Sequence, residues 1–173
     1  MSILGVAIIA GLLAGYVRAR RQQQTLQLPG LTAEWLVIVA VLPQIVVFFL
    51  PGLERLASRE VASIVLVASQ ALLLLSIWLN RSDSALLIIG IGLAMNLLVI
   101  GANGGLMPIS PSTVQQLDPT LDLSQRTYGE RLGGSKDQLL PESETRLALL
   151  ADRIVPPDWF PVKAAYSLGD VLI

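Results

Sequence analysis

The sequence predicts an all-α fold: a helical membrane protein with four spans, followed by an extramembrane tail that contains short amphipathic helices. Hydrophobic residues make up 53% of the 173 residues and charged residues only 14%, against roughly 25% charged in soluble domains. The long apolar runs all lie in the first part of the chain, and charge and proline gather in the second. We therefore assign residues 1–105 to a transmembrane bundle and residues 106–173 to an extracytoplasmic tail.

The first expected span covers residues 2–17 and carries Ala7, Gly11 and Gly15 at four-residue spacing. Such a row of small residues lets a second helix approach closely in a membrane. The alternative is that glycine is simply common in membrane helices. Because the arginines follow the apolar run rather than precede it, the segment is expected to be a retained span and not a signal peptide.

The second expected span covers residues 31–50, a length that crosses a hydrocarbon core of about 30 Å. Thr32 is the expected N-cap, with Glu34 in the first turn near the positive end of the helix. Pro43 lies inside the span and is expected to kink it.

The third and fourth expected spans cover residues 61–79 and 84–101. Arginine in short loops sets orientation in membranes, because positive loops stay inside. The first and third loops carry more of it than the second, which places them in the cytoplasm and both termini outside. The arginines of those two loops are Arg18, Arg20, Arg21 and Arg81.

A helix stop follows the fourth span. Glycine costs about 1 kcal/mol in a helix interior and readily adopts left-handed turns, so Asn103, Gly104 and Gly105 end the helix. The residue before a proline avoids helical angles, and Met107 therefore continues into Pro108 on an extended path.

In the tail, Ser110 and the proline after it form a helix start, with serine as the cap. Residues 118–140 show no sustained period and are expected to form a loop. Residues 141–155 are expected to form an amphipathic helix that is too short and too charged to span. Residues 162–173 are apolar but too short to cross a membrane. The apolar face of the expected amphipathic helix comprises Leu147, Leu150, Ala151 and Ile154.

Three amides lie within the spans: Gln44, Gln70 and Asn96. Amides in a bundle usually join helices; the alternative is a substrate or ion site, which usually adds an ionisable group. Gln44 and Asn96 lie at similar depth, so we expect them to face the bundle interior. There they would bond each other, the carbonyl freed by Pro43, or a trapped water.

Asp170 is the carboxylate of the closing Gly169-Asp170 motif. The expected role is a helix cap, in which the aspartate accepts backbone donors. A functional carboxylate is the alternative, and it needs a partner group at a defined distance.

Composition excludes several function classes. There is no cysteine and no histidine, which removes disulfides, the usual zinc and iron–sulfur sites and a Ser-His-Asp triad. A net charge of −1 argues against nucleic acid as a partner. Residues 129–136 read Gly-x-x-x-x-Gly-Ser-Lys, but a phosphate-binding loop needs the lysine before the hydroxyl residue.

Three stretches resemble a family of uncharacterised bacterial multi-pass membrane proteins, a domain of unknown function. They are Ala102-Asn103-Gly104-Gly105-Leu106-Met107-Pro108, residues 145–154 and the closing Gly169-Asp170-Val171. The first is similar to an Ala-Asn-Gly-Gly-x-Met-Pro signature and the last to a Gly-Asp-Val element. The resemblance implies a small multi-span protein of the bacterial inner membrane. It also implies a further apolar helix after the last element, which this sequence, ending at Ile173, does not contain.

These observations lead us to expect a non-catalytic protein without cofactors whose partners are the lipid bilayer and other membrane subunits. An accessory or assembly subunit of a larger bacterial membrane complex fits the small-residue row and the missing catalytic residue types. The alternative is a small transporter or a lipid- or quinone-binding module that uses the amides and the kink at Pro43.

Overall fold

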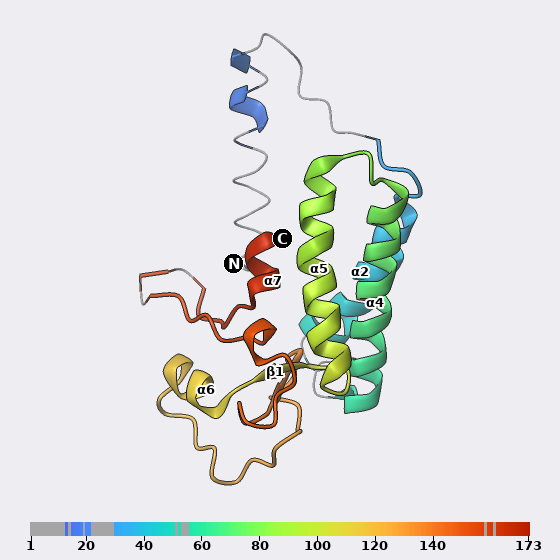
Figure 1. Cartoon of the computed structure of the whole chain (residues 1–173). Coiled ribbons are helices and arrows are strands. Elements are labelled where there is room, and N and C mark those ends of the chain that lie inside the picture. Colours follow the sequence, from blue (N-terminus) through green and yellow to red (C-terminus); the bar gives the residue numbers. More distant parts are fainter. Residues whose placement is uncertain are drawn as a thin grey trace.

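The computed structural model of the chain describes residues 13, 15–18, 20, 21, 30–50, 52, 56–157, 159, 160 and 162–173. The structure is mostly helical, with one small sheet. A bundle of helices stands above a folded cap, which we define as residues 106–173 (Figure 1). The first expected span, residues 2–17, lies mainly outside the described residues.

Among the described residues, three helices form the bundle: α2 (Trp35–Phe49), α4 (Arg59–Leu79) and α5 (Ser84–Ala102). Helix α4 packs against both α2 and α5. Helices α4 and α5, with 21 and 19 residues, are long and apolar enough to cross a membrane, whereas α2 is a shorter apolar helix.

The start of α2 corrects the sequence prediction. Thr32 lies in a turn and does not cap the helix; the cap residue is Glu34, whose side chain makes no capping bond. The backbone N–H of Thr32 instead donates to Asn80 Oδ1 at 2.7 Å, and Asn80 Nδ2 donates to the Thr32 carbonyl at 3.0 Å. This exchange ties the beginning of α2 to the turn between α4 and α5.

The expected helix stop is confirmed. Helix α5 ends at Ala102, and Gly104 and Gly105 adopt positive φ values of 84° and 93°. A Cβ on Gly105 would lie 2.7 Å from Ser63 Cβ, so this position needs glycine for both its backbone angle and its space. The chain then leaves in extended form as β1 (Met107–Ile109), as the Met107–Pro108 pair predicts.

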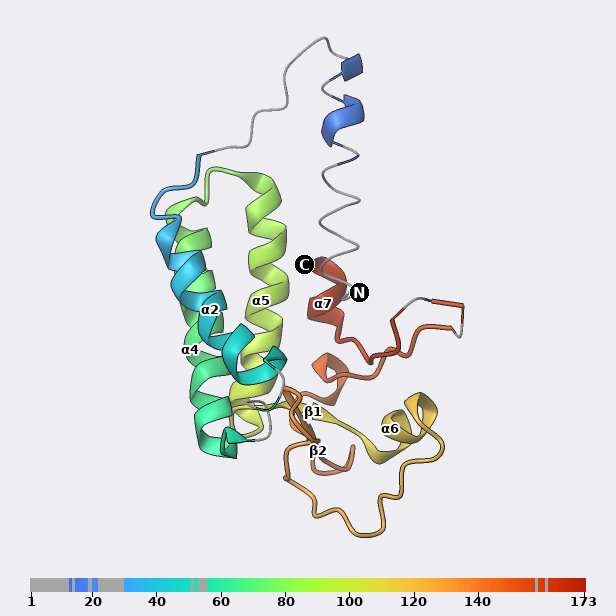
Figure 2. The same cartoon turned by 180° about the vertical axis from the view of Figure 1, so that it is seen from behind.

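The cap begins with a parallel pair, β1 and β2 (Asp137–Leu139), in which Met107 lies opposite Asp137 (Figure 2). Helix α6 (Pro111–Leu117) lies between the two strands in the sequence. It starts as predicted, because the Thr113 N–H donates to Ser110 Oγ at 3.1 Å. The stretch expected to be a loop, residues 118–140, therefore contains a strand.

The amphipathic helix expected over residues 141–155 does not form. Thr145 closes one turn onto the Pro141 carbonyl, Leu147 is left-handed with φ 56°, and only a short 3-10 helix, η1 (Ala148–Leu150), follows. The chain then joins the sheet, because the Asp152 N–H donates to the Pro108 carbonyl at 3.1 Å. Pairing with β1 overrides the helical pattern of the sequence.

The chain closes with α7 (Leu168–Leu172), which lies beside α5 and runs in the opposite direction (Figures 1 and 2). A hydrophobic core joins the bundle to the cap at the lower end of α4 and α5. Its members are Val47, Ala62, Leu66, Val99, Ile100, Leu106, Met107 and Ala151. A second, smaller core lies within the cap around Ile109, Val114, Leu139 and Ala165.

Candidate functional site

Charged side chains from three parts of the cap meet around Lys136, and we call Lys136, Asp137, Asp152 and Asp170 the Lys136 cluster. Lys136 Nζ lies 3.1 Å from Asp152 Oδ2 and 3.6 Å from Asp170 Oδ2. Asp152 is only 2% exposed, whereas Lys136 and Asp170 are half-buried. The cluster forms because β2 starts beside Lys136 and the Asp152 segment bridges to β1 at Ile109. The segment before α7 in turn pairs with the Asp152 segment through the bridge between Ile154 and Tyr166.

The cluster continues onto α5 through neutral side chains. Asn96 Nδ2 donates to Asp170 Oδ1 at 2.7 Å, and Ser167 Oγ donates to Asn96 Oδ1 at 2.8 Å. Ser167 and Asp170 also form a capping box, in which each side chain accepts the backbone N–H of the other. The sequence predicts Asp170 as a cap for the residues that follow it, but the N-cap of α7 is Ser167, and Asp170 lies in the first turn and accepts the N–H of the preceding Ser167. The Asp170 carboxylate has in addition the charged partner Lys136.

Two glycines allow α7 to come this close to α5. A Cβ on Gly92 would lie 2.6 Å from the Gly169 carbonyl oxygen, and a Cβ on Gly169 would lie 2.6 Å from the Gly92 carbonyl oxygen. Neither contact is possible for a larger residue without a shift. The glycine pair therefore sets the depth at which Asp170 meets Asn96.

Electrostatics shift the pKa values of the cluster. Burial raises the pKa of Asp152 to about 8 although Lys136 opposes the change, and burial also raises the pKa of Asp137. Burial acts to lower the pKa of Lys136, but Asp152, Asp137 and Asp170 together raise it above its usual value. Lys136 thus stays charged, whereas burial resists ionisation of both neighbouring carboxyls.

Two arginines fasten the cap to the bundle. Arg59, at the start of α4, donates to the Gly129 carbonyl at 3.0 Å and to Gln138 Oε1 at 2.9 Å. Arg131 donates to the carbonyls of Ala57 at 3.1 Å and Val47 at 3.3 Å. Both use charge-assisted hydrogen bonds to chain segments distant in sequence.

The signature turn takes part in the same attachment. Asn103 exchanges two bonds with the backbone of Arg146, one at 2.8 Å and one at 2.9 Å, and Gln138 Nε2 donates to the Leu106 carbonyl at 3.2 Å. Met107 and Pro108 are buried in β1. The stretch that the sequence singled out is therefore the joint between the two parts of the molecule.

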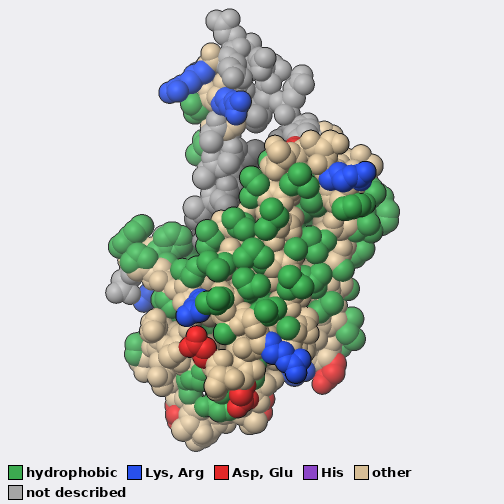
Figure 3. All heavy atoms as spheres, viewed as in Figure 1, with side chains coloured by type: hydrophobic (Ala, Val, Ile, Leu, Met, Phe, Trp, Pro, Cys, Tyr) green, Lys and Arg blue, Asp and Glu red, His purple; other side chains and the backbone are tan. Residues whose placement is uncertain are grey.

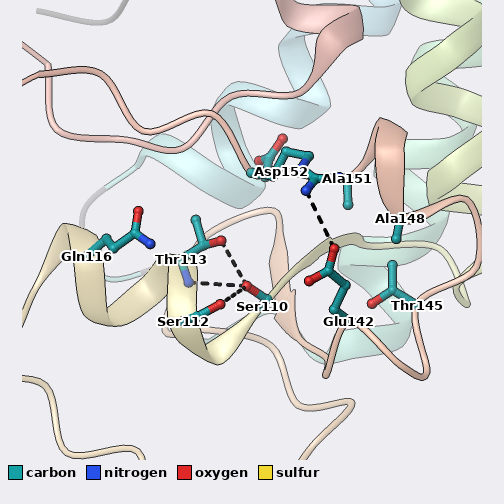
Figure 4. A pocket seen from close by; sticks show the side chains of 10 residues that line it. Ser110, Ser112, Thr113, Gln116, Glu142, Thr145, Ala148, Ala151 and Asp152 are labelled. Carbon is teal, nitrogen blue, oxygen red and sulfur yellow. Dashed lines mark hydrogen bonds and ion pairs between the residues drawn. The ribbon is translucent and has the colours of Figure 1, made fainter.

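A cavity of about 160 Å³ opens between α6 and η1 (Figure 4). On one side, the Ser110, Ser112 and Thr113 hydroxyls contact one another, with both Ser110 contacts at 2.8 Å. On the other, Arg153 pairs with Glu142 at 3.5 Å. Within the described part of the chain, no three His, Cys, Asp or Glu side chains are placed to hold a metal ion.

The structure separates the predicted polar residues. Asn96 bonds Ser167 and Asp170, so the expected Gln44–Asn96 pair is wrong. Gln44 is half-buried on α2, and Gln70 is buried on α4, where its Oε1 has no partner among the described residues. Ala7 and Gly11 lie outside the described residues; Gly15 is helical and half-buried.

Sequence reasoning missed Lys136, Asp137, Asp152 and the two arginines as site residues. Lys136 was considered only as part of a faulty phosphate loop. The available signal is a single carboxylate within an otherwise apolar or turn-rich segment, as in Ala151-Asp152 and Leu168-Gly169-Asp170.

The chain is a mostly helical protein in which two of the described helices are long and apolar enough to cross a membrane, with a polar cap that contacts both of them. It belongs to a family of unknown function, DUF5317, whose model matches residues 30–173. No curated protein and no solved structure matches the chain.

Proposed function

We propose that this chain is a non-catalytic, four-span protein of the bacterial inner membrane that acts as an accessory or assembly subunit. In this role it packs against a larger membrane complex. The observation that carries the proposal is the apolar outer surface of the bundle (Figure 3): in the apolar windows of α4 and α5, only 28% and 33% of residues are buried within the chain. Such a surface needs lipid or other helices to cover it.

One outward stripe of α4 is suited to a second helix. Ile64, Ala68, Ala71 and Leu75 follow one another at helical spacing and are all exposed. The two alanines in its middle lower the surface between larger side chains, and small residues of this kind let helices approach closely in a membrane.

The proposed topology places the cap and the loop between α2 and α4 outside, with Arg81 in the cytoplasm. The fold supports this arrangement, because Arg131 of the cap bonds Val47 and Ala57 at one end of the bundle, whereas Arg81 and Thr32 lie at the other. Single cysteines at exposed cap positions such as Ser143 should react with an impermeant reagent in intact cells. Protection of the cap would overturn the orientation.

The accessory role is tested by purification in mild detergent from the native host. Co-purifying subunits should be lost in Ala68→Phe and Ala71→Phe, which fill the stripe. The matched control is Ile88→Phe, an exposed apolar position on α5, which should keep them. If neither alanine variant changes the co-purifying set, this stripe is not where the subunit packs.

A second candidate function is a small transporter or a lipid- or quinone-binding module. The polar connection from Lys136 through Asp170 to Asn96 favours it, because it brings an ion pair to a membrane-length helix. Native mass spectrometry of the purified chain distinguishes the two: a bound small molecule on a lone chain supports the module, and stable subunits support the accessory role.

A further inference from the structure

The charges of the Lys136 cluster do not balance. Three carboxyls surround one ammonium group, and both Asp152 and Asp170 use the same Lys136 Nζ. Arg153, which follows Asp152 in the sequence, pairs instead with Glu142. With every carboxyl ionised, the cluster would hold a net charge of −2, which is costly where water is excluded.

Polar atoms without partners point to what corrects the balance. Among the described residues, Asp137 Oδ1, Asp152 Oδ1 and the Tyr166 hydroxyl are buried and have no hydrogen-bond partner. An ionised carboxylate can only accept, whereas a protonated carboxyl also donates. One added proton therefore supplies both a missing charge and a missing donor.

The buried hydroxyl of Tyr166 does not remove the excess negative charge. It is 8% exposed, and the charges of Asp170, Lys136 and Asp152 all act on its hydroxyl. Burial raises the pKa of Tyr166, with Asp170 adding to the effect, so the phenol stays neutral beside the carboxyls. A neutral phenol cannot offset their charge.

We propose that Asp137 and Asp152 share one proton at neutral pH, which makes the Lys136 cluster a buried proton-binding site, and that losing this proton loosens the attachment of α7 to α5. Asp137 and Asp152 act on each other's pKa, and interacting carboxyls resist a second negative charge and titrate as a pair. Without the proton, Asp152 competes fully for Lys136 and the pairing of Lys136 with Asp170 weakens.

The groups that face the pair set the pH range. They are Lys136 beside β2, Asp170 on α7 and Tyr166 on the following segment, whereas α5 contributes only the neutral Asn96. The pKa of Asp152 is raised to about 8 in the folded chain and is about 4 in an unfolded one. The stability that this proton contributes is therefore full below about pH 4 and is lost as the pH rises through about 8.

Infrared difference spectroscopy on the full chain in nanodiscs tests the proton directly. Between about pH 6 and about pH 10, we expect loss of the band of a protonated carboxyl. Asp152→Asn and Asp137→Asn should each remove this titrating band. The matched control Asp122→Asn, at an exposed carboxyl whose pKa is lowered by its bonds to Ser124, should keep it.

Hydrogen exchange of the α7 amides tests the consequence. Corrected for intrinsic rates, the opening of α7 should rise by up to about tenfold per pH unit as one proton is lost. Asp152→Asn should make opening nearly independent of pH. If the native chain shows no protonated carboxyl at about pH 6, or if both variants keep the band, the proton site is wrong. An α7 opening that does not change with pH overturns the coupling.

Discussion

The bundle and the cap are held together by different interactions. In the bundle, α2, α4 and α5 meet through apolar side chains, and the buried amide of Gln70 leaves an oxygen without a described partner. The cap is held to the bundle by side-chain bonds that cross long distances in sequence, such as Arg59 to Gln138 and Asn96 to Asp170. A membrane can support the first part with lipid, but the second has to supply its own cohesion through specific polar partners.

This difference implies that single substitutions act most strongly where the two parts meet. Gly92→Leu should have the largest effect, because a Cβ added at this position would lie only 2.6 Å from the Gly169 carbonyl oxygen and 3.0 Å from Leu172 Cβ. Overpacking of this kind costs about 3 kcal/mol. Hydrogen exchange should show α7 released from α5. Gly101→Leu, on the same helix with no heavy atom within 4 Å of its Cβ, is the control and should behave like the parent chain.

Arg59→Met should have the next largest effect. The variant leaves the Gly129 carbonyl and Gln138 Oε1 without their charged donor, at a cost of about 2 kcal/mol. Limited proteolysis should then cut the cap faster while the bundle stays intact. The control Arg81→Met removes an arginine at the far end of the bundle. Equal proteolysis of the two variants would contradict the role of Arg59 in attaching the cap to the bundle.

A smaller and local effect is expected within residues 106–173. Ser110→Ala removes the N-cap side chain of α6, including the bond from the Thr113 N–H at 3.1 Å, and should cost about 1 kcal/mol. Chemical denaturation, with hydrogen exchange of the α6 amides, measures this loss of stability. The control Ser143→Ala, at an exposed serine, should not change the stability. If the exchange of α6 is unchanged in Ser110→Ala, the N-cap serine is not needed.

The smallest effect should come from the bundle itself. Gln70→Leu removes a buried oxygen that has no partner in the described chain, so the change should be below about 1 kcal/mol and stabilising in direction. Thermal unfolding in detergent measures it. A clear loss of stability would show that Gln70 bonds a group that matters, and the contrast between the two parts would weaken.

The sequence predicts α4 and α5 well because their signals are local. The apolar runs and the glycines after α5 give the limits of these two helices within about two residues. The exception is α2, whose first turn is replaced by the bonds between Thr32 and Asn80, two residues that are 48 positions apart.

The site could be predicted only in part. Asn96 as an inward amide follows from local rules and is present, whereas the N-cap of α7 is Ser167 and Asp170 serves as its partner in the capping box. Their pairing does not follow, because it depends on α7 returning to α5 across 74 residues. The same applies to Lys136 and Asp152, which meet only because a segment with a helical pattern joins β1 instead.

The contact between α7 and α5 also has a consequence for the order of assembly. A ribosome completes Asn96 long before it reaches Ser167 and Asp170, and during that interval the amide has none of its final partners. In the proposed topology, α5 would enter the bilayer with an uncovered polar side chain next to Gly92, or wait beside the insertion machinery until α7 emerges. The contact between α5 and α7 is complete only once α7 has been made, so deletion of α7 should act as an assembly defect.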